Sequence, residues 1–468
     1  MLRSLTISIL LITTSIFSVA EETKQDSSSD AKPRHVILII GDGMDDHQIT
    51  IARNYLVGAS GHLALDQMAL RSTSQILTTE DKSDGKPVYV ADSANTATTM
   101  ATGVITSRGR IATAPGSNKA IVTIAELAQA AGYRTGIVST ASVTDATPAA
   151  FAAHISFRMC ENPDVMPDVS YKDIHIGDCI DEMKTHGGTG SISEQLAESA
   201  LDVLLGGGSK HFAPTAEGSS DSVRQLAESN GFQVVTTVAE LQAAEIGRRT
   251  LGLFSESTMP VRLRGENGRA AEAPEPSLLN YVHQYLGDVT QPEIMNCEPN
   301  PGFASTPSLK QMADAALAHL SHENERGFFL MIESASIDKE SHKRHPCGSI
   351  GEVEQLNEAL TSALDFAREN PRTLILVTAD HSQAAQLIPN ESLFAEFPIP
   401  VYSPGKLARI RTPEGGIMAV NYATNNFFME EHTGANVPLF ANDEGLGRVP
   451  AFIQQPQIFT ISRDYLGL

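Results

Sequence analysis

The chain has 468 residues, 41% of them hydrophobic, and its 56 acidic side chains outnumber the 34 basic ones, which gives a formal net charge of −22. That length is sufficient for one large domain or two medium ones. The acidic excess excludes nucleic acid, beyond a terminal phosphate, and anionic membranes as partners. It would also repel an anionic substrate, unless a local feature reverses the sign of the field.

The first twenty residues are typical of an export signal. Arg3 supplies a positive start, residues 5–17 are mostly apolar, and residues 18–20 (SVA) fit a small-residue cleavage site. The apolar run is short for a bilayer span. We therefore predict a signal peptide over 1–20, a disordered mature N-terminus over 21–34, and a periplasmic or secreted product with no membrane helix.

Short apolar runs alternate with amphipathic stretches in the remaining chain. The strand-like runs are 35–40, 135–139, 327–332 and 373–378, and the helix-like stretches are 121–131, 309–320 and 352–367. Continuous apolar strands separated by helices predict an α/β fold, with a mostly parallel central sheet flanked by helices on both faces. We expect a single domain over 35–468, with surface insertions at 259–291 and 401–416.

Four cysteines follow the predicted export signal, at positions 160, 179, 297 and 347. Their spacing does not match a CxxC zinc site, and an oxidising compartment favours structural disulfides. Three pairings are possible, and cysteine spacing alone does not choose among them.

The stretch 88–103, VYVADSANTATTMATG, places Asp92 and Ser93 where a helix is expected to begin. Both residue types are preferred helix caps, and the stretch by itself favours that interpretation. The alternative is that Ser93 is presented to a substrate, since the helix dipole behind it favours an anion.

Acidic, imidazole and hydroxyl side chains stand just after the predicted strands. They are Asp42, Asp145, Thr147, Glu333, Asp338, His342, Asp380 and His381. Ligands of open α/β sheets bind beyond the carboxyl ends of the strands. Because clustered carboxylates repel one another and are costly to desolvate, bound cations are expected at this edge.

Each motif by itself has an ordinary interpretation. Asp338 and His342 lie one helical turn apart and share a face, as a surface salt pair also would. His432, in EEHTG, is by default a loop histidine. The chain has no GxSxG motif, which argues against an α/β-hydrolase, and GGGSK at 206–210 lacks the phosphate-loop pattern.

The motifs are specific in combination. In chain order they are DGM (42–44), ADSA (91–94), STASVTDATP (139–148), IESASIDKESH (332–342), VTADH (377–381) and EHTG (431–434). From about His35 to its end the sequence resembles the alkaline phosphatase family. The resemblance is closest to the bacterial periplasmic members, because Asp145 and Lys339 stand where animal members carry histidines.

The resemblance implies hydrolysis of phosphate monoesters to an alcohol and inorganic phosphate, through a phosphoserine on Ser93 and with two zinc ions and one magnesium ion. It implies a first zinc site of Asp338, His342 and His432. It implies a second zinc site of Asp42, Asp380, His381 and Ser93. It implies a magnesium site of Asp42, Thr147 and Glu333. Mixed imidazole and carboxylate ligands suit zinc, and oxygen ligands suit magnesium.

The resemblance also assigns roles around the phosphate. Arg158 would clamp two phosphate oxygens, Asp92 would orient Arg158, and Asp145 and Lys339 would surround the magnesium and the phosphate. Three divalent cations together with Arg158 would outweigh the carboxylates that hold them, so an acidic protein could bind a phosphate dianion only while metallated.

The resemblance alone implies two disulfides within the chain, Cys160–Cys179 and Cys297–Cys347. It also implies that two copies of the chain form a homodimer.

The chain departs from the family at Asp45, which follows DGM where a glycine is usual. If that position needs a positive φ, aspartate tolerates it better than most residues, and the extra carboxylates of Asp45 and of Asp46 after it could shift metal affinity. The segment between His381 and His432 is short, which predicts an open, unselective pocket.

Three other functions fit the sequence less well. A phosphodiesterase or phosphonate hydrolase of the same superfamily generally lacks the third-metal ligands and the clamping arginine. A sulfatase is disfavoured because no cysteine stands at the nucleophile position. A secreted phosphate- or metal-binding protein without turnover would not require Ser93 at a helix start.

Overall fold

The computed structural model describes residues 32–391, 397 and 403–468. Contacts within the chain separate Met1–Lys32 from Pro33–Leu468, and the description below concerns the second unit. The predicted signal peptide, residues 1–20, and most of the predicted disordered segment 21–34 lie outside the described residues. The first strand begins at Arg34, one residue inside that segment.

A ten-stranded sheet forms the centre of this unit, in the order β22-β2-β21-β17-β1-β16-β5-β8-β10-β9. Strand β1 (Arg34–Gly41) runs parallel to β16 (Gly327–Ser334) and β17 (Thr373–Ala379), and β16 runs parallel to β5 (Arg134–Ser142). Strand β21 (Val437–Ala441) is antiparallel to its neighbours β17 and β2. The outer strands are β2 (Leu70–Gln75), β8 (Val203–Gly207), β9 (Gln233–Val235), β10 (Thr250–Leu253) and β22 (Phe452–Gln454).

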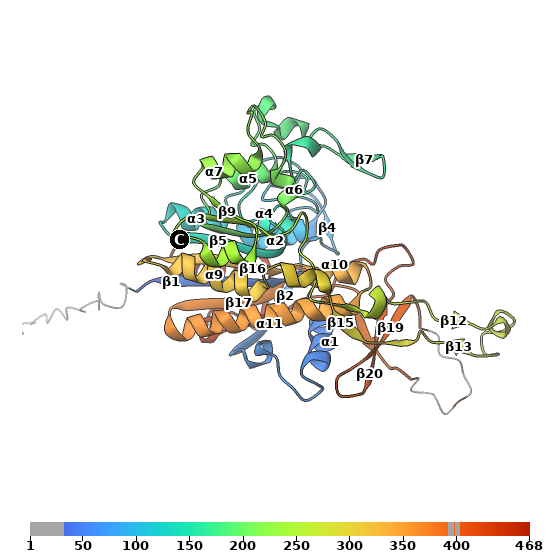
Figure 1. Cartoon of the computed structure of the whole chain (residues 1–468). Helices are drawn as coiled ribbons and strands as arrows, with labels where there is room; N and C mark the ends of the chain where they lie inside the picture. The colour runs from blue at the N-terminus through green and yellow to red at the C-terminus, as the bar shows by residue number, and fades with distance from the viewer. Residues whose placement is uncertain (1–31, 392–396, 398–402) are drawn as a thin grey trace, which may run out of the picture. The chain divides into compact units, whose positions relative to one another are not determined.

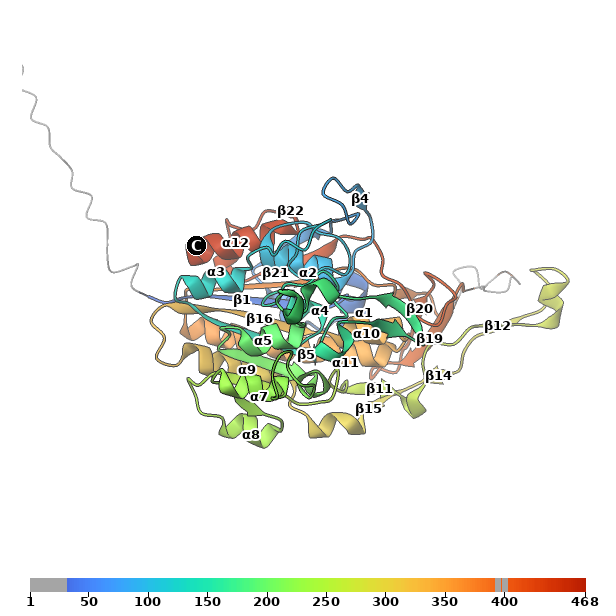
Figure 2. The same cartoon turned by 90° about the horizontal axis from the view of Figure 1, so that it is seen from above.

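Helices cover both faces of this sheet (Figures 1 and 2), which confirms the predicted fold class. Successive side chains of a strand point to opposite faces, so Val36 and Leu38 of β1 enter one core and Ile37 and Ile39 enter the other. The first core is covered by α2 (Ser93–Thr102), α3 (Ile124–Ala130), α5 (Ile192–Glu198) and α12 (Pro456–Leu466). The second is covered by α1 (Asp46–Leu56), α9 (Leu309–Ser321) and α11 (Pro346–Glu369).

The parallel register brings three strand ends to one edge. Gly41 of β1 pairs with Ser334 of β16 and with Ala379 of β17. Asp42 and Asp380, the next residues of β1 and β17, therefore lie beside each other at the same edge as Glu333.

The two predicted insertions, 259–291 and 401–416, contribute strands to small sheets that also include strands from outside those ranges. In the first, β11 (Leu263–Gly265) pairs with β15 (Cys297–Pro299), and β12 (Glu275–Pro276) with β13 (Val289–Thr290) forms an arm that extends from the sheet (Figures 1 and 2). In the second, residues 401 and 402 lie outside the described part, and β19 (Lys406–Arg411) joins a four-stranded sheet. Its other strands are β14 (Ile294–Met295), β18 (Gln386–Ile388) and β20 (Ile417–Tyr422).

The cysteines pair as the family resemblance implies, Cys160 with Cys179 and Cys297 with Cys347. The first disulfide closes the loop that holds the hairpin β6 (Val169–Tyr171) and β7 (Ile174–Gly177). Among the described helices, none combines the length and the apolar character that crossing a bilayer requires.

Candidate active site

Ser93 is the first residue of α2 and Asp92 is its cap. The Asp92 carboxylate accepts from the Asn95 N–H at 3.1 Å, and the Asn95 side chain accepts in return from the Asp92 N–H at 2.9 Å. Ser93 Oγ lies 3.2 Å from His381 Nε2 and 3.5 Å from Asp42 Oδ1. Asp92 therefore caps the helix, as its residue type predicts, and Ser93 faces groups from two distant strand ends.

Asp42 and Asp380 meet around His381. Its Nε2 lies 3.4 Å from Asp42 Oδ1 and 3.4 Å from Asp380 Oδ2. The other Asp380 oxygen accepts from the N–H groups of Gly43, at 3.0 Å, and His381, at 2.8 Å. Gly43 has a φ of +66°, a conformation that glycine adopts at no steric cost, so this tight turn can hold Asp380 in place.

A second cluster joins α10 (Ser336–His342) to the loop between β20 and β21. His342 Nε2 lies 3.2 Å from Asp338 Oδ2, and His432 Nε2 lies 3.3 Å from Asp338 Oδ1. The two Nε2 atoms are 3.0 Å apart. The shared helix face of Asp338 and His342 is thus turned toward His432, far along the chain.

Backbone carbonyls fix both histidine rings of this cluster. His342 Nδ1 lies 2.5 Å from the carbonyl oxygen of Glu430, and His432 Nδ1 lies 2.8 Å from that of Ala91. A carbonyl can only accept, so each Nδ1 carries a proton and each Nε2 directs its lone pair toward Asp338 and the other ring. Facing lone pairs require a cation or a proton between them, which is the arrangement of a metal site.

Asp42, Thr147 and Glu333 offer oxygen atoms only. Ser139 Oγ donates to Glu333 Oε2 at 2.5 Å, and Glu333 is buried. The buried hydroxyl of Thr147, in α4 (Ala146–Ala149), has no hydrogen bond of good geometry among the described residues, although it lies near enough to help hold down the pKa of Glu333. A buried hydroxyl close to the Glu333 carboxyl group fits a hard cation such as magnesium.

Burial sets the protonation of the acids when no cation is bound. Burial raises the pKa of Asp42 well above its usual range, and the nearby charges of Asp380 and Asp338 raise it further. Burial likewise raises the pKa of Glu333 to about 8. These acids can be ionised at neutral pH only where positive charge compensates them.

The histidine cluster behaves in the opposite way. Burial disfavours the charge on Asp338, but His342 and His432 outweigh it and hold the pKa of Asp338 well below its usual range. Burial would lower the pKa of His432, yet Asp338 raises it to about 9. Asp338 therefore attracts a positive charge, either a proton on His432 or a metal ion.

Basic side chains line one side of the site. Asp145 accepts from Arg158 at 2.9 Å and from the Lys339 ammonium, and a second Arg158 nitrogen lies 3.3 Å from Asp92 Oδ2. Asp92 also accepts from the Gly109 N–H at 3.1 Å. Burial would lower the pKa values of Arg158 and Lys339, but the surrounding carboxylates, Asp145 foremost among them, together outweigh it and raise both pKa values, so both remain cations.

Asp45 does not adopt the positive φ considered for it. Its φ is −80°, and it caps α1 by accepting from the N–H groups of His47 and Gln48 at 3.0 Å each. Its other oxygen accepts from Ser382 Oγ at 2.6 Å. Both carboxylate oxygens accept from donors that belong to no predicted ligand set. The aspartate that replaces glycine here therefore acts as a helix cap and as a partner of Ser382.

Two contacts of the ligand shell were not anticipated from the sequence. Gln383 Nε2 donates to Asp338 Oδ1 at 2.6 Å, and Ser139 holds Glu333 as described above. Gln383 follows the ADH motif by two residues, and Ser139 ends a predicted strand. Their place at strand ends was a usable signal, since polar residues there face the ligand edge.

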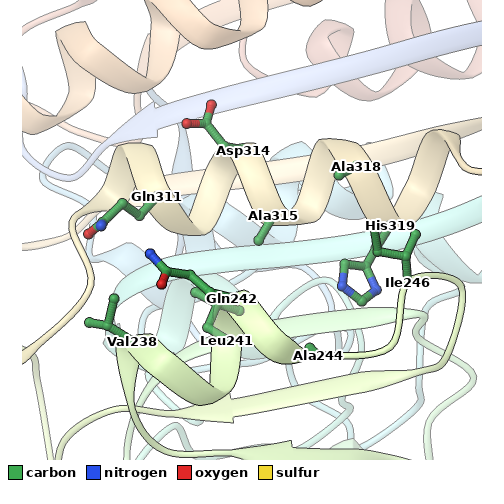
Figure 3. A pocket seen from close by; sticks show the side chains of 10 residues that line it. All are labelled: Val238, Leu241, Gln242, Ala244, Ile246, Gln311, Asp314, Ala315, Ala318 and His319. Carbon is green, nitrogen blue, oxygen red and sulfur yellow. The ribbon is translucent and has the colours of Figure 1, made fainter.

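A hollow elsewhere has none of this chemistry (Figure 3). It has a volume of about 310 Å³ and lies between α8 (Val238–Ala243) and α9, where aliphatic side chains such as Leu241 and Ile246 face Ala315. His319 is its one ring (Figure 3). Among the described residues, the groups able to hold a metal are all at the strand-end edge.

Comparison with known proteins agrees with this geometry. A family model described as alkaline phosphatase matches residues 33–399. An alkaline phosphatase of Escherichia fergusonii is 39% identical over 96% of this chain and 89% of its own length, and one of Escherichia coli K12 is 38% identical over 95% and 88%. A streptomycin-6-phosphate phosphatase of Streptomyces griseus is 38% identical over 96% of this chain and 94% of its own.

Solved structures support the fold. The alkaline phosphatase of Thermus thermophilus has a TM-score of 0.65 at 19% identity, over 96% of this chain and 95% of its own. That of the Antarctic bacterium TAB5 has a TM-score of 0.64 at 22% identity, over 93% and 98%. A variant of the Antarctic enzyme has been solved with Mg bound in its M3 site.

Proposed function

The chain belongs to the alkaline phosphatase family of phosphoric monoester hydrolases, and from that premise we propose that it hydrolyses phosphate monoesters through a phosphoserine formed on Ser93. The single observation that carries the proposal is the convergence on one serine. Ser93 Oγ lies 3.2 Å from His381 Nε2 and 3.5 Å from Asp42 Oδ1, at an edge where several acids are buried near one another.

We propose three metal sites on the residues that the sequence singled out. Asp338, His342 and His432 would hold one zinc ion. Asp42, Asp380, His381 and Ser93 would hold a second. Asp42, Thr147 and Glu333 would hold a magnesium ion. When bound, such cations lower the pKa of the serine hydroxyl, stabilise the oxygen that leaves the phosphorus, and neutralise the phosphate charge.

The protein itself supplies the nucleophile and its position. Ser93 Oγ attacks the phosphorus, the bond to the ester oxygen breaks, and the alcohol departs. Water then hydrolyses the phosphoserine, which releases inorganic phosphate and restores the hydroxyl. The capped start of α2 presents Oγ with the positive end of the helix dipole behind it, an arrangement that favours a phosphoryl group.

The basic side of the site would hold the phosphate. The Arg158 guanidinium is oriented by Asp145 and Asp92 and is 23% exposed, so donors remain for two phosphate oxygens. Lys339, held by Asp145, adds a second positive charge on the same side. Phosphoryl transfer is mostly positioning and charge stabilisation, and these residues supply both.

Export and dimerisation are part of the proposal. Two disulfides fit an oxidising compartment, as does the export signal predicted over 1–20. The family resemblance supports a homodimer, and the acidic surface argues against nucleic-acid partners.

The proposal is tested by letting the protein react with a monoester labelled in its phosphoryl group and then quenching the reaction with acid. We expect label on the peptide that contains Ser93, and monoesters hydrolysed much faster than diesters of the same alcohol. An equal or reversed preference would support a diesterase instead, and phosphate binding with no turnover would support a binding protein.

A further inference from the structure

One ligand of the histidine cluster stands on a loop and needs a support of its own. His432 lies between β20 and β21, in a stretch without regular secondary structure, whereas Asp338 and His342 lie on α10. Ligands on loops are held less accurately than ligands on helices unless neighbouring contacts fix them. The contacts that fix this loop therefore decide how well the three ligands fit one ion.

A buried ion pair joins the two segments of the cluster. Arg344 Nε donates to Glu430 Oε2 at 2.7 Å, and the two side chains are only 2% and 0% exposed. Arg344 stands two residues after His342, and Glu430 stands two residues before His432. The pair thus ties together, at the same offset, the two histidines that the chain separates by 90 residues.

Arg344 also holds the backbone of the loop. Its guanidinium nitrogens donate to the carbonyl oxygens of Phe428 at 3.2 Å and Phe427 at 3.0 Å, and to the Asn425 side-chain oxygen at 3.3 Å. Arg344 has a φ of +62°, which non-glycine residues rarely adopt and which persists only where the surroundings fix it.

Glu430 connects the pair to a metal ligand directly. Its N–H donates to the His342 carbonyl at 2.9 Å, and its own carbonyl accepts from His342 Nδ1 at 2.5 Å. Its other carboxylate oxygen, Oε1, accepts from the Thr424 N–H at 2.7 Å. The same residue that pairs with Arg344 therefore sets the tautomer and the orientation of the His342 ring.

We propose that Arg344 and Glu430 are positioning residues that set the zinc affinity of the site formed by Asp338, His342 and His432. This inference rests on the proposed function, since it assumes that zinc binds there. Neither residue contacts the reacting atoms. Arg344 fixes the loop that carries His432, and Glu430, paired with Arg344, fixes the orientation of the His342 ring and the position of His432.

Zinc titration of the metal-free protein tests the proposal. The double variant Arg344→Met/Glu430→Gln removes both charges, so that no unpaired charge stays buried. The control is Arg262→Met/Glu358→Gln, which removes a bidentate pair of 2.7 Å contacts outside the site. Zinc affinities are measured by competition with a chromophoric chelator, beside thermal unfolding of the metal-free proteins.

We expect one zinc affinity of the double variant to fall about 10- to 100-fold, as for other residues that orient metal ligands. The second affinity and both affinities of the control should stay within about twofold of the parent. Repeating the titration in a His381→Ala background, which lacks a ligand of the other site, assigns the loss to the histidine cluster.

Unchanged zinc affinities in a folded double variant would overturn the proposal. Should that variant fail to fold, Arg344→Lys keeps the charge but loses the guanidinium fork, and it should weaken the same site in the same direction; an unchanged affinity there would overturn it equally. A parent protein that binds no zinc would instead refute the proposed function, and the parent titration alone reveals that outcome.

Discussion

The strand-end edge and the hollow between α8 and α9 show two opposite ways of building a concave surface. The hollow has a volume of about 310 Å³, and its lining mixes aliphatic side chains with a few scattered polar ones, namely Gln242, Gln311, Asp314 and His319. The edge gathers buried acids and imidazoles whose lone pairs face one another, such as the two Nε2 atoms 3.0 Å apart on His342 and His432.

A concave shape by itself therefore does not identify a functional site in this protein. The hollow brings no group of acids or imidazoles together, because its one acid, Asp314, and its one imidazole, His319, belong to no cluster able to hold a metal in the part of the chain that the structure describes. At the edge, by contrast, Asp42, Glu333 and Asp338 are buried near one another and require compensating charge. A catalytic or metal-binding site is therefore expected at the strand-end edge, where the burial of these acids costs free energy.

Removing the proposed nucleophile should cause the largest loss of activity of any change considered below. Ser93→Ala should lower kcat/KM for a monoester by about 10⁴-fold or more, since the covalent step is lost while phosphate still binds. Steady-state kinetics and phosphate competition measure the two effects. Turnover within tenfold of the parent would remove Ser93 from its role.

Removing the clamping arginine should have the next largest effect. Arg158→Met loses charge-assisted hydrogen bonds to phosphate worth about 1.5–3 kcal/mol, so the inhibition constant of inorganic phosphate should rise about 10- to 100-fold. The matched control is Arg108→Met, at an exposed arginine. An equal change in both variants would indicate a general charge effect instead of a clamp.

The pH dependence of stability should reveal the uncompensated edge. Folding raises the pKa of Glu333 from 4.5 to about 8 and that of His432 from 6.5 to about 9. The metal-free folded protein then binds more protons than the unfolded chain between pH 6 and 9. Its free energy of unfolding should therefore fall as the pH rises through that window, by on the order of 5 kcal/mol for the two groups together.

Denaturant unfolding of the metal-free protein at pH 6 and pH 9 measures this loss. The variant Glu333→Gln has no carboxyl group to titrate at this position, so it should lose about half of the dependence, and the half that His432 contributes should remain. A metal-free protein that becomes more stable toward pH 9 would show that these groups are not held protonated.

Filling the hollow should have the smallest effect. Ala318→Leu adds an aliphatic side chain at its rim and should leave kcat/KM within about twofold and stability within about 0.5 kcal/mol. A marked loss of turnover would mean that the hollow is coupled to the edge, and the contrast between the two regions would fail.

Much of the fold followed from local patterns. The run 35–40 is a buried strand because every second side chain finds a core on each face, and the predicted helix 121–131 shortens to α3 because Thr123 caps it at Ile124. The extent of the insertion sheets was not predictable, since strands of two to six residues are specified by distant partners such as β14 on β19.

The site was predictable where spacing carries the geometry. Asp338 and His342 share a helix face because they lie one turn apart, and Asp42 beside Asp380 follows from two parallel strands in register. The placement of His432 came from the family resemblance, because a loop histidine has no periodicity. Its partner pair, Arg344 with Glu430, gave no local signal, since each is an ordinary charged residue until the fold joins them.

Metal analysis of the purified protein shows whether the acids and imidazoles that separate segments gather around Ser93 hold cations. After exchange into metal-free buffer, the prediction is two zinc ions and one magnesium ion per chain. Fewer than two zinc ions per chain in an active preparation, or activity that survives complete chelation, would contradict it.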